Sequence, residues 1–188
     1  MEYMIRELRN SEVKELDTFL YEAIFIPEGV EAPTKDIILQ PALQVYVADF
    51  GKRKDDKCLV AEADAKIIGA VWVRMMNDYG YVDDETPSFA ISVLKEYRGY
   101  GIGTKLMQGM LEALRNDGYK QASLSVQKSN YAEKCIRRSD LKFCVRMTKN
   151  ISWCADFKIL MPSVLRIDVG KRTLMGNIKL IIGHFESR

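Results

Sequence analysis

The stretch SFAISVLKEYRGYGIGTKLMQGML, residues 88–111, joins an apolar, strand-like run to a helix-like repeat through a turn that is rich in glycine. Gly99, Gly101 and Gly103 stand in this turn, although glycine inside a regular element costs roughly 0.5–1 kcal/mol relative to alanine. The first amides of a helix have no partner within it, and with the helix dipole they attract anions. The bare backbone therefore predicts a site for a phosphate or pyrophosphate, with Arg98 beside it as a cation.

The spacing of the glycines distinguishes three kinds of phosphate-binding turn. A Walker A loop needs Gly-x-x-x-x-Gly-Lys-Ser/Thr, and Gly103-Thr104-Lys105 does not supply it. A dinucleotide-binding fingerprint needs Gly-x-Gly-x-x-Gly, and here the third glycine comes one residue too early. The pattern Arg-x-x-Gly-x-Gly remains, formed by Arg98, Gly101 and Gly103. Taken alone, such a turn is equally compatible with a plain helix entry.

The composition is that of one ordinary globular domain. The 188 residues are 47% hydrophobic and 29% charged, and no apolar run approaches the ~20 residues that a membrane span needs. The acidic start MEYMIRE does not resemble a signal peptide. Four cysteines without a Cys-x-x-Cys pair and a single histidine, His184, argue against a metal site. Free thiols favour the cytoplasm as the compartment.

Hydrophobic periodicity predicts a mixed α/β domain. A strand opens the chain, and a helix from about Val13 to Ile24 follows, with Asn10-Ser11 as its N-cap. The remaining elements are expected, in order, as a short helix at 34–40, a hairpin at 58–76 that turns at 64–66, a strand ending at Val93, a helix closed by Gly118 and a strand at 121–127.

Residues 88–111 resemble, almost residue for residue, the acetyl-CoA-binding motif of the GNAT acetyltransferases, and the similarity extends over about residues 3–132. The resemblance implies the GNAT acyl-CoA N-acyltransferase fold, a mixed α/β domain with a mostly antiparallel central sheet and flanking helices. It also implies that a bulged strand binds the pantetheine arm through free backbone groups and that the turn wraps the pyrophosphate. The residues so assigned to acetyl-CoA are Ile91, Ser92, Val93, Arg98, Gly99, Tyr100, Gly101, Ile102, Gly103, Thr104 and, in a motif like Asn-x-Ala, Asn130, which could equally cap a helix.

The activity implied by the resemblance is direct transfer of an acetyl group to a primary amine of a small molecule or peptide. The amine must lose a proton, and the tetrahedral oxyanion needs a hydrogen-bond donor. The backbone N–H of Val93 is the expected donor, and Glu85, in the run Asp83-Asp84-Glu85, is the expected base, although such runs are usually solvated loops. No metal, nucleic-acid or membrane partner is expected, and a monomer and a homodimer both remain open. Weaker candidates are Glu22 and Glu28 for the base and Tyr79 and Tyr81 for an amine pocket.

Residues after about 132 depart from the family pattern. After Asn-x-Ala the family continues with a tyrosine, a glycine and a phenylalanine, where this chain has Ile136, Asp140 and Leu141. The charge changes at the same place, since residues 1–132 carry 16 basic and 21 acidic side chains and residues 133–188 carry 12 and 5. We therefore divide the chain into a GNAT core, 1–132, and an atypical basic segment, 133–188, that replaces the last helix and strands of the family.

A frameshift is one hypothesis for this departure. With synonymous codons chosen for Lys134 to Phe143, the frame offset by two bases reads Met-Tyr-Thr-Lys-Ile-Gly-Phe, which restores the missing motif. In the family, the tyrosine commonly protonates the leaving thiolate, a role left here to water or Tyr131. The alternative function is therefore an acetyl-CoA-binding module with little or no transferase activity.

Overall fold

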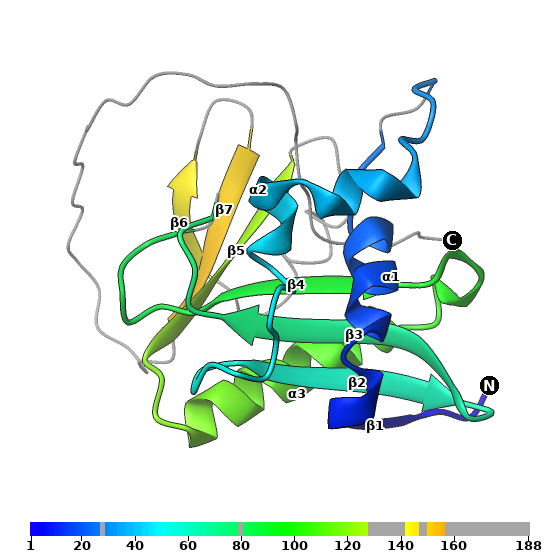
Figure 1. Cartoon of the computed structure of the whole chain (residues 1–188). Helices are drawn as coiled ribbons and strands as arrows, with labels where there is room; N and C mark the ends of the chain where they lie inside the picture. Colours follow the sequence, from blue (N-terminus) through cyan, green and yellow to red (C-terminus); the bar gives the residue numbers. More distant parts are fainter. Residues whose placement is uncertain (27–28, 79–80, 128–141, 147–149, 157–188) are drawn as a thin grey trace.

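The computed structural model describes residues 1–26, 29–78, 81–127, 142–146 and 150–156, and these contain one seven-stranded sheet (Figure 1). The strands are β1 (Met4–Glu7), β2 (Lys57–Ala63), β3 (Lys66–Arg74), β4 (Ser88–Val93), β5 (Gln121–Gln127), β6 (Lys142–Arg146) and β7 (Asn150–Asp156). They lie in the order β1-β2-β3-β4-β5-β7-β6, and every neighbouring pair is antiparallel except β4 and β5, which are parallel. The predicted mixed, mostly antiparallel sheet is confirmed.

Helices cover both faces of the sheet. Figure 1 shows α1 in front of the strands and α3 behind them. The helices of the described chain are α1 (Glu15–Glu22), α2 (Pro41–Gln44) and α3 (Ile102–Asn116), with 3-10 turns at Asn10–Glu12, Lys35–Leu39 and Lys95–Tyr97. The order of elements up to β5 is the one that the sequence predicts.

The first helix begins later than predicted. α1 starts at Glu15 with Lys14 as its N-cap, and Ser11 lies exposed within the preceding 3-10 turn, so the predicted cap is wrong. The carboxylate of Glu12 accepts a hydrogen bond from the Arg9 N–H (2.9 Å) and closes that turn instead. This turn also has a tertiary partner on β1, since Glu12 binds Arg6, as described next.

An arginine on β1 holds two carboxylates, one from the 3-10 turn and one from β2. The Arg6 guanidinium donates to both oxygens of Glu12 (2.8 Å each) and through Nε to Glu62 (2.6 Å). Hydrogen bonding from Arg6 is the main reason why the pKa of Glu12 falls from 4.5 to about 2. The pair joins the start of the helical layer to the edge of the sheet.

The ion pair between Arg6 and Glu12 makes the stability of the fold depend on pH. Because its folded pKa lies below its unfolded value, the stabilisation is complete above about pH 4.5 and is lost as the pH falls through about 2. We expect Glu12→Gln to lower the urea midpoint at pH 7 and to converge with the wild type as the pH approaches 2. Urea unfolding across this range measures it, with Glu2→Gln, at the exposed chain start, as the control. A constant difference at all pH values would contradict the assignment.

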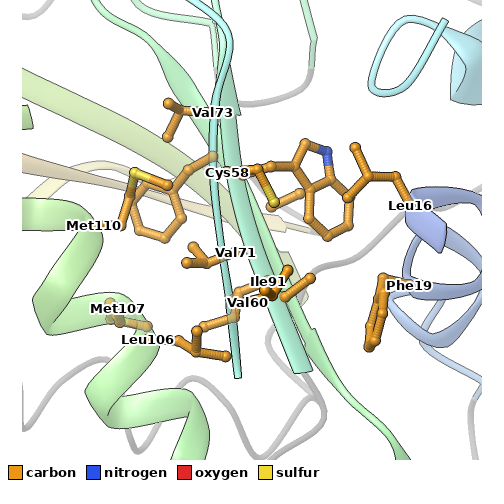
Figure 2. Close-up of a cluster of buried hydrophobic side chains, with 14 of the residues drawn as sticks. Leu16, Phe19, Cys58, Val60, Val71, Val73, Ile91, Leu106, Met107 and Met110 are labelled. Carbon is orange, nitrogen blue, oxygen red and sulfur yellow. The ribbon is translucent and has the colours of Figure 1, made fainter. Parts of the chain in front are cut away.

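The core lies on both sides of β3, whose residues from Ile68 onward are buried. Strands that are covered on both faces are apolar almost throughout, as this one is. Gly69 permits a close approach there, since a Cβ at that position would lie 3.1 Å from Leu106 Cδ1 and 3.2 Å from Val93 Cγ2. Because Gly69 has no side chain, the start of α3 packs closely against β3 and the end of β4. Figure 2 shows Leu16 and Phe19 of α1 on one side of the strands and Leu106, Met107 and Met110 of α3 on the other.

Strands β6 and β7 come from the segment that departs from the family pattern. β7 pairs antiparallel with β5 along its whole length, and β6 pairs with β7. These two strands were not predicted from the sequence. Residues 128–141 and 157–188 lie outside the described residues.

Candidate functional site

β4 and β5 pair only where they begin. Their single register pair is Ser88 with Ser123, and the Ser123 N–H donates to the Pro87 carbonyl (2.9 Å). On its other edge β4 stays paired with β3 as far as Val93, which lies opposite Gly69. The second half of β4 therefore has one edge that no strand of the described residues covers, which we call the open edge.

Two hydrogen bonds establish which residues of β4 use that edge. The Pro87 carbonyl points to β5, whereas the Leu94 N–H donates to the Ile68 carbonyl of β3 (3.0 Å). Backbone groups of alternate residues point to opposite edges of a strand. Ile91 and Val93 therefore direct their N–H groups to the β5 side, as the sequence analysis requires of both.

Ser92 lies between them and uses the other edge. It pairs with Ala70 of β3, and its Oγ donates to the Phe19 carbonyl of α1 (2.7 Å), so the structure does not bring Ser92 to the open edge. The pairing of β3 with β4 runs without a register shift from Ser88 to Val93. The expected bulge is absent from β4, and the free edge arises from the separation of β4 and β5 instead.

The glycine turn follows the open edge. Gly99 and Gly101 adopt φ angles of 83° and 75°, a left-handed conformation that side chains disfavour. Gly101 is the N-cap of α3, so the N–H groups of the first turn of this 15-residue helix follow it. Tyr100 and Thr104 are exposed beside them, whereas Ile102 and Gly103 are buried. The turn thus presents helix-start amides next to the open edge of β4.

Arg98 braces the turn. Its Nε donates to the Val93 carbonyl and its Nη2 to Glu22 of α1, both at 2.9 Å. The Arg98 side chain is 5% exposed and that of Glu22 is 18% exposed. These two sequence-predicted residues are brought together as a part-buried ion pair that joins α1, the end of β4 and the turn. The guanidinium is engaged inside the protein rather than directed into solvent as a cation for an anion.

The acidic loop before β4 bonds largely to itself. Asp83 accepts the Thr86 hydroxyl (2.5 Å) and the Glu85 N–H (3.0 Å). Asp84 accepts the Tyr81 hydroxyl (2.9 Å), and this hydrogen bond is the main reason why the pKa of Tyr81 is raised. Glu85 is exposed and lies beside a hollow of about 740 Å³ at the ends where β4 and β5 begin. The hollow is lined by Asp55, Met75, Asp84, Glu85, Thr86, Gly118, Tyr119, Lys120 and Gln121.

A second polar group, unmarked by any sequence motif, lies at the junction of β4 and β5. Asp78 accepts the Tyr46 hydroxyl at Oδ2 (2.9 Å) and the Ser88 hydroxyl at Oδ1 (2.8 Å). The Ser88 and Ser123 hydroxyls lie 3.0 Å apart, and both side chains are fully buried. Asp78 itself is half-buried. A fixed carboxylate therefore stands at the point from which the two strands separate.

Some sequence-predicted positions cannot be located. They are Glu28, Tyr79, Asn130, Tyr131, Ile136 and His184, which lie outside the described residues. Within the part of the chain that the structure describes, no three acidic, histidine or cysteine side chains gather in a way that could hold a metal ion. None of its helices is long and apolar enough to cross a membrane.

The family model described as Acetyltransferase (GNAT) family matches residues 18–136. The chain belongs to this family. It is 38% identical over 65 residues to probable N-acetyltransferase camello of Xenopus tropicalis, and 30% identical over 87 residues to N-acetyltransferase 8B of Homo sapiens. These alignments cover 35% and 44% of this chain but only 28% and 38% of the relatives, so the chain matches less than half of their length.

Solved GNAT structures share the fold at low identity. PaiA N-acetyltransferase of Thermoplasma acidophilum, in complex with coenzyme A, has a TM-score of 0.61 and 15% identity, covering 84% of this chain and all of that one. A GNAT family acetyltransferase of Brucella melitensis, in complex with acetyl-CoA, has a TM-score of 0.52 and 24% identity, covering 86% and 92%. The GNAT fold predicted from the residue 88–111 motif is thereby confirmed.

Proposed function

We propose that this GNAT protein is an acetyl-CoA-dependent N-acetyltransferase that acts on a primary amine. One observation carries the proposal: the open edge of β4 leads directly to a helix start whose glycines are left-handed. An extended arm with amide groups suits the first feature, and a pyrophosphate suits the second. The solved relatives that hold coenzyme A or acetyl-CoA support the same donor.

Backbone groups do most of the binding in this proposal. The N–H groups of Ile91 and Val93 pair with the pantetheine arm as a neighbouring strand would, and the amides from Gly99 to Thr104 receive the pyrophosphate. Arg98 acts by holding the turn through Val93 and Glu22. Asn130 and Tyr100 are further proposed contacts of acetyl-CoA.

The chemistry is a direct displacement. The amine nitrogen attacks the thioester carbonyl carbon, a C–N bond forms, and the C–S bond breaks to release the thiolate of coenzyme A. The amine gives up one proton and the thiolate gains one. A backbone N–H on the open edge nearer Ser88 stabilises the oxyanion, a contribution worth roughly 10²–10³ in rate at comparable sites. The Val93 N–H, which the sequence suggests for this role, pairs with the arm instead.

Calorimetry with acetyl-CoA and thiol release in the presence of an amine panel test this proposal. Saturable binding of acetyl-CoA with amine-dependent thiol release is the expected result. Absence of binding contradicts it outright. Binding without thiol release from any small-molecule or peptide amine would favour the alternative, a module that only holds acetyl-CoA. A cytoplasmic location and a monomeric or homodimeric state belong to the same proposal. The buried Cys58 is a free thiol, which suits a reducing compartment.

We also propose the division of the chain into a GNAT core, 1–132, and a basic segment, 133–188. The end of the family match at Ile136 supports this boundary. If a frameshift created the segment, the source gene should regain the family's tyrosine, glycine and phenylalanine when one base is added or removed near the codon for Glu133. Sequencing the gene in its native genome measures this. A native frame that encodes CIRRSDLKFC without interruption contradicts the frameshift.

A further inference from the structure

The carboxylate at the junction of β4 and β5 lies at the reacting end of the proposed site. The pyrophosphate turn follows the C-terminal end of β4, so an arm bound along the open edge runs from the turn toward Ser88. Ser88 lies about 10 Å along the strand from Ile91, at ~3.3 Å per residue. Asp78 binds the Ser88 hydroxyl at 2.8 Å. The thioester lies at the end of the arm. It therefore points to the Asp78 end of the gap between the diverging parts of β4 and β5.

The same carboxylate lies on the face of the sheet opposite α3. Side chains of alternate residues share a face, so Ser88 points to the side on which Ser92 binds the Phe19 carbonyl of α1. Tyr46, which lies two residues after the end of α2 and donates to Asp78, belongs to this side as well. On the opposite face, Val93 packs beside α3. The donor turn thus begins the helix on one face, and Asp78 stands on the other.

The geometry points to Asp78 as the general base that takes the proton from the acceptor amine, which enters from the α1 and α2 face. This inference rests on the proposed function. The positioned carboxylate accepts the extra proton of the ammonium form before attack, and solvent on the half-buried side of Asp78 then removes it. The proton that the nitrogen loses as the C–N bond forms goes to the departing thiolate. The Tyr46 and Ser88 hydroxyls act as positioning groups, because each fixes one carboxylate oxygen.

The other candidate bases of the described chain have different partners. Glu22 is paired with Arg98, and Asp83 is bound to Thr86. Glu85 is exposed on its loop, beside the hollow at the start of the strands. Of these four carboxylates, only Asp78 is hydrogen-bonded to a residue of β4, and that residue is Ser88, from which the two strands separate.

The test compares Asp78→Asn with Glu85→Gln, and uses Asp55→Asn as the control. Asparagine keeps one oxygen that can accept a hydrogen bond from a hydroxyl group, so we expect this variant to fold. Asp55 is a matched control because it also accepts a tyrosine hydroxyl, that of Tyr119, away from the gap. The probes are acetyl-CoA with ethylamine, which is protonated at pH 7, and with trifluoroethylamine, which is largely unprotonated. Calorimetry follows acetyl-CoA binding, and thiol release follows turnover.

We expect Asp78→Asn to lower kcat with ethylamine by about 10²-fold or more, the usual scale of a general base, and to leave the Kd for acetyl-CoA unchanged. With trifluoroethylamine the loss of kcat should be smaller, because most of that amine is already in its neutral form. A merely structural role would reduce both rates equally. Asp78→Glu should recover part of the rate, and Asp55→Asn should behave as the wild type.

Three results would overturn the inference: a similar loss with both amines, a loss confined to Glu85→Gln, or a wild type that binds acetyl-CoA but releases thiol with neither probe. Absence of acetyl-CoA binding to the wild type contradicts the proposed function itself. The two failures are thus distinguished by calorimetry before any rate is measured.

Discussion

Gly101→Glu should abolish acetyl-CoA binding, with the Kd weakened by at least about 100-fold. Gly101 has φ 75° and caps α3, and a Cβ there would point into open space with no atom within 4 Å. A glutamate side chain would enter the space proposed for the pyrophosphate, where like charges cost several kcal/mol, and ~2.8 kcal/mol already corresponds to 100-fold. Isothermal calorimetry at fixed ionic strength measures the effect.

Gly101→Gln is the matched control, since it has the same size and the same unfavourable φ but no charge. It should weaken binding by clearly less than the glutamate. Gly103 is a poorer position for this test because it is buried within α3, where a charge would disturb the fold. An affinity that Gly101→Glu leaves unchanged would contradict the assignment of the turn to the pyrophosphate.

Arg74→Met should lower the free energy of unfolding by about 3–5 kcal/mol, the usual cost of leaving one partner of a buried ion pair alone. Arg74 and Asp56 are both fully buried side chains, joined by two hydrogen bonds of 2.7 and 2.8 Å. Arg74 also donates to the carbonyls of Val45 (3.2 Å) and Ala48 (2.7 Å), and it stacks 5.2 Å from the centre of the Phe50 ring. This one guanidinium fastens the segment between α2 and β2 to β3.

An exposed ion pair in the same segment supplies the control. Lys52 and Asp49 have side chains that are 75% and 69% exposed, so Lys52→Met should change stability by ~1 kcal/mol at most. Urea unfolding followed by circular dichroism measures both variants. The double variant Arg74→Met with Asp56→Leu should recover part of the loss, because no buried charge is left without its partner. A loss for Arg74→Met no larger than that for Lys52→Met would contradict this view of the segment.

Local backbone chemistry explains why much of the fold could be predicted. The turn from Gly99 to Gly101 needs left-handed residues, and glycine reveals that need directly in the sequence. The hairpin turn at Asp64 and Ala65, with φ angles of 48° and 60°, was likewise predicted from its position between two apolar strands. The end of α3 is equally local, because Gly118 follows it at φ 87°.

Tertiary partners explain what could not be predicted. Arg98 looks like a free cation in the sequence, but its partner Glu22 is 76 residues away along the chain. The open edge of β4 depends on the angle at which β5 leaves it, which no residue of either strand specifies alone. Asp78 lies in no motif, and its two hydroxyl partners come from Tyr46 and Ser88. In the sequence, the base was therefore sought in the acidic run that contains Glu85 and, less strongly, at Glu22 and Glu28.

The lone register pair between Ser88 and Ser123 also has a mechanical meaning. A sheet resists bending across its strands in proportion to the hydrogen bonds that join them, and here β1 to β4 meet the β5-β7-β6 half through one pair. Between these two strands, widening of the gap by an occupant is opposed by the backbone and hydroxyl contacts of Ser88 and Ser123 rather than by a full ladder of backbone hydrogen bonds.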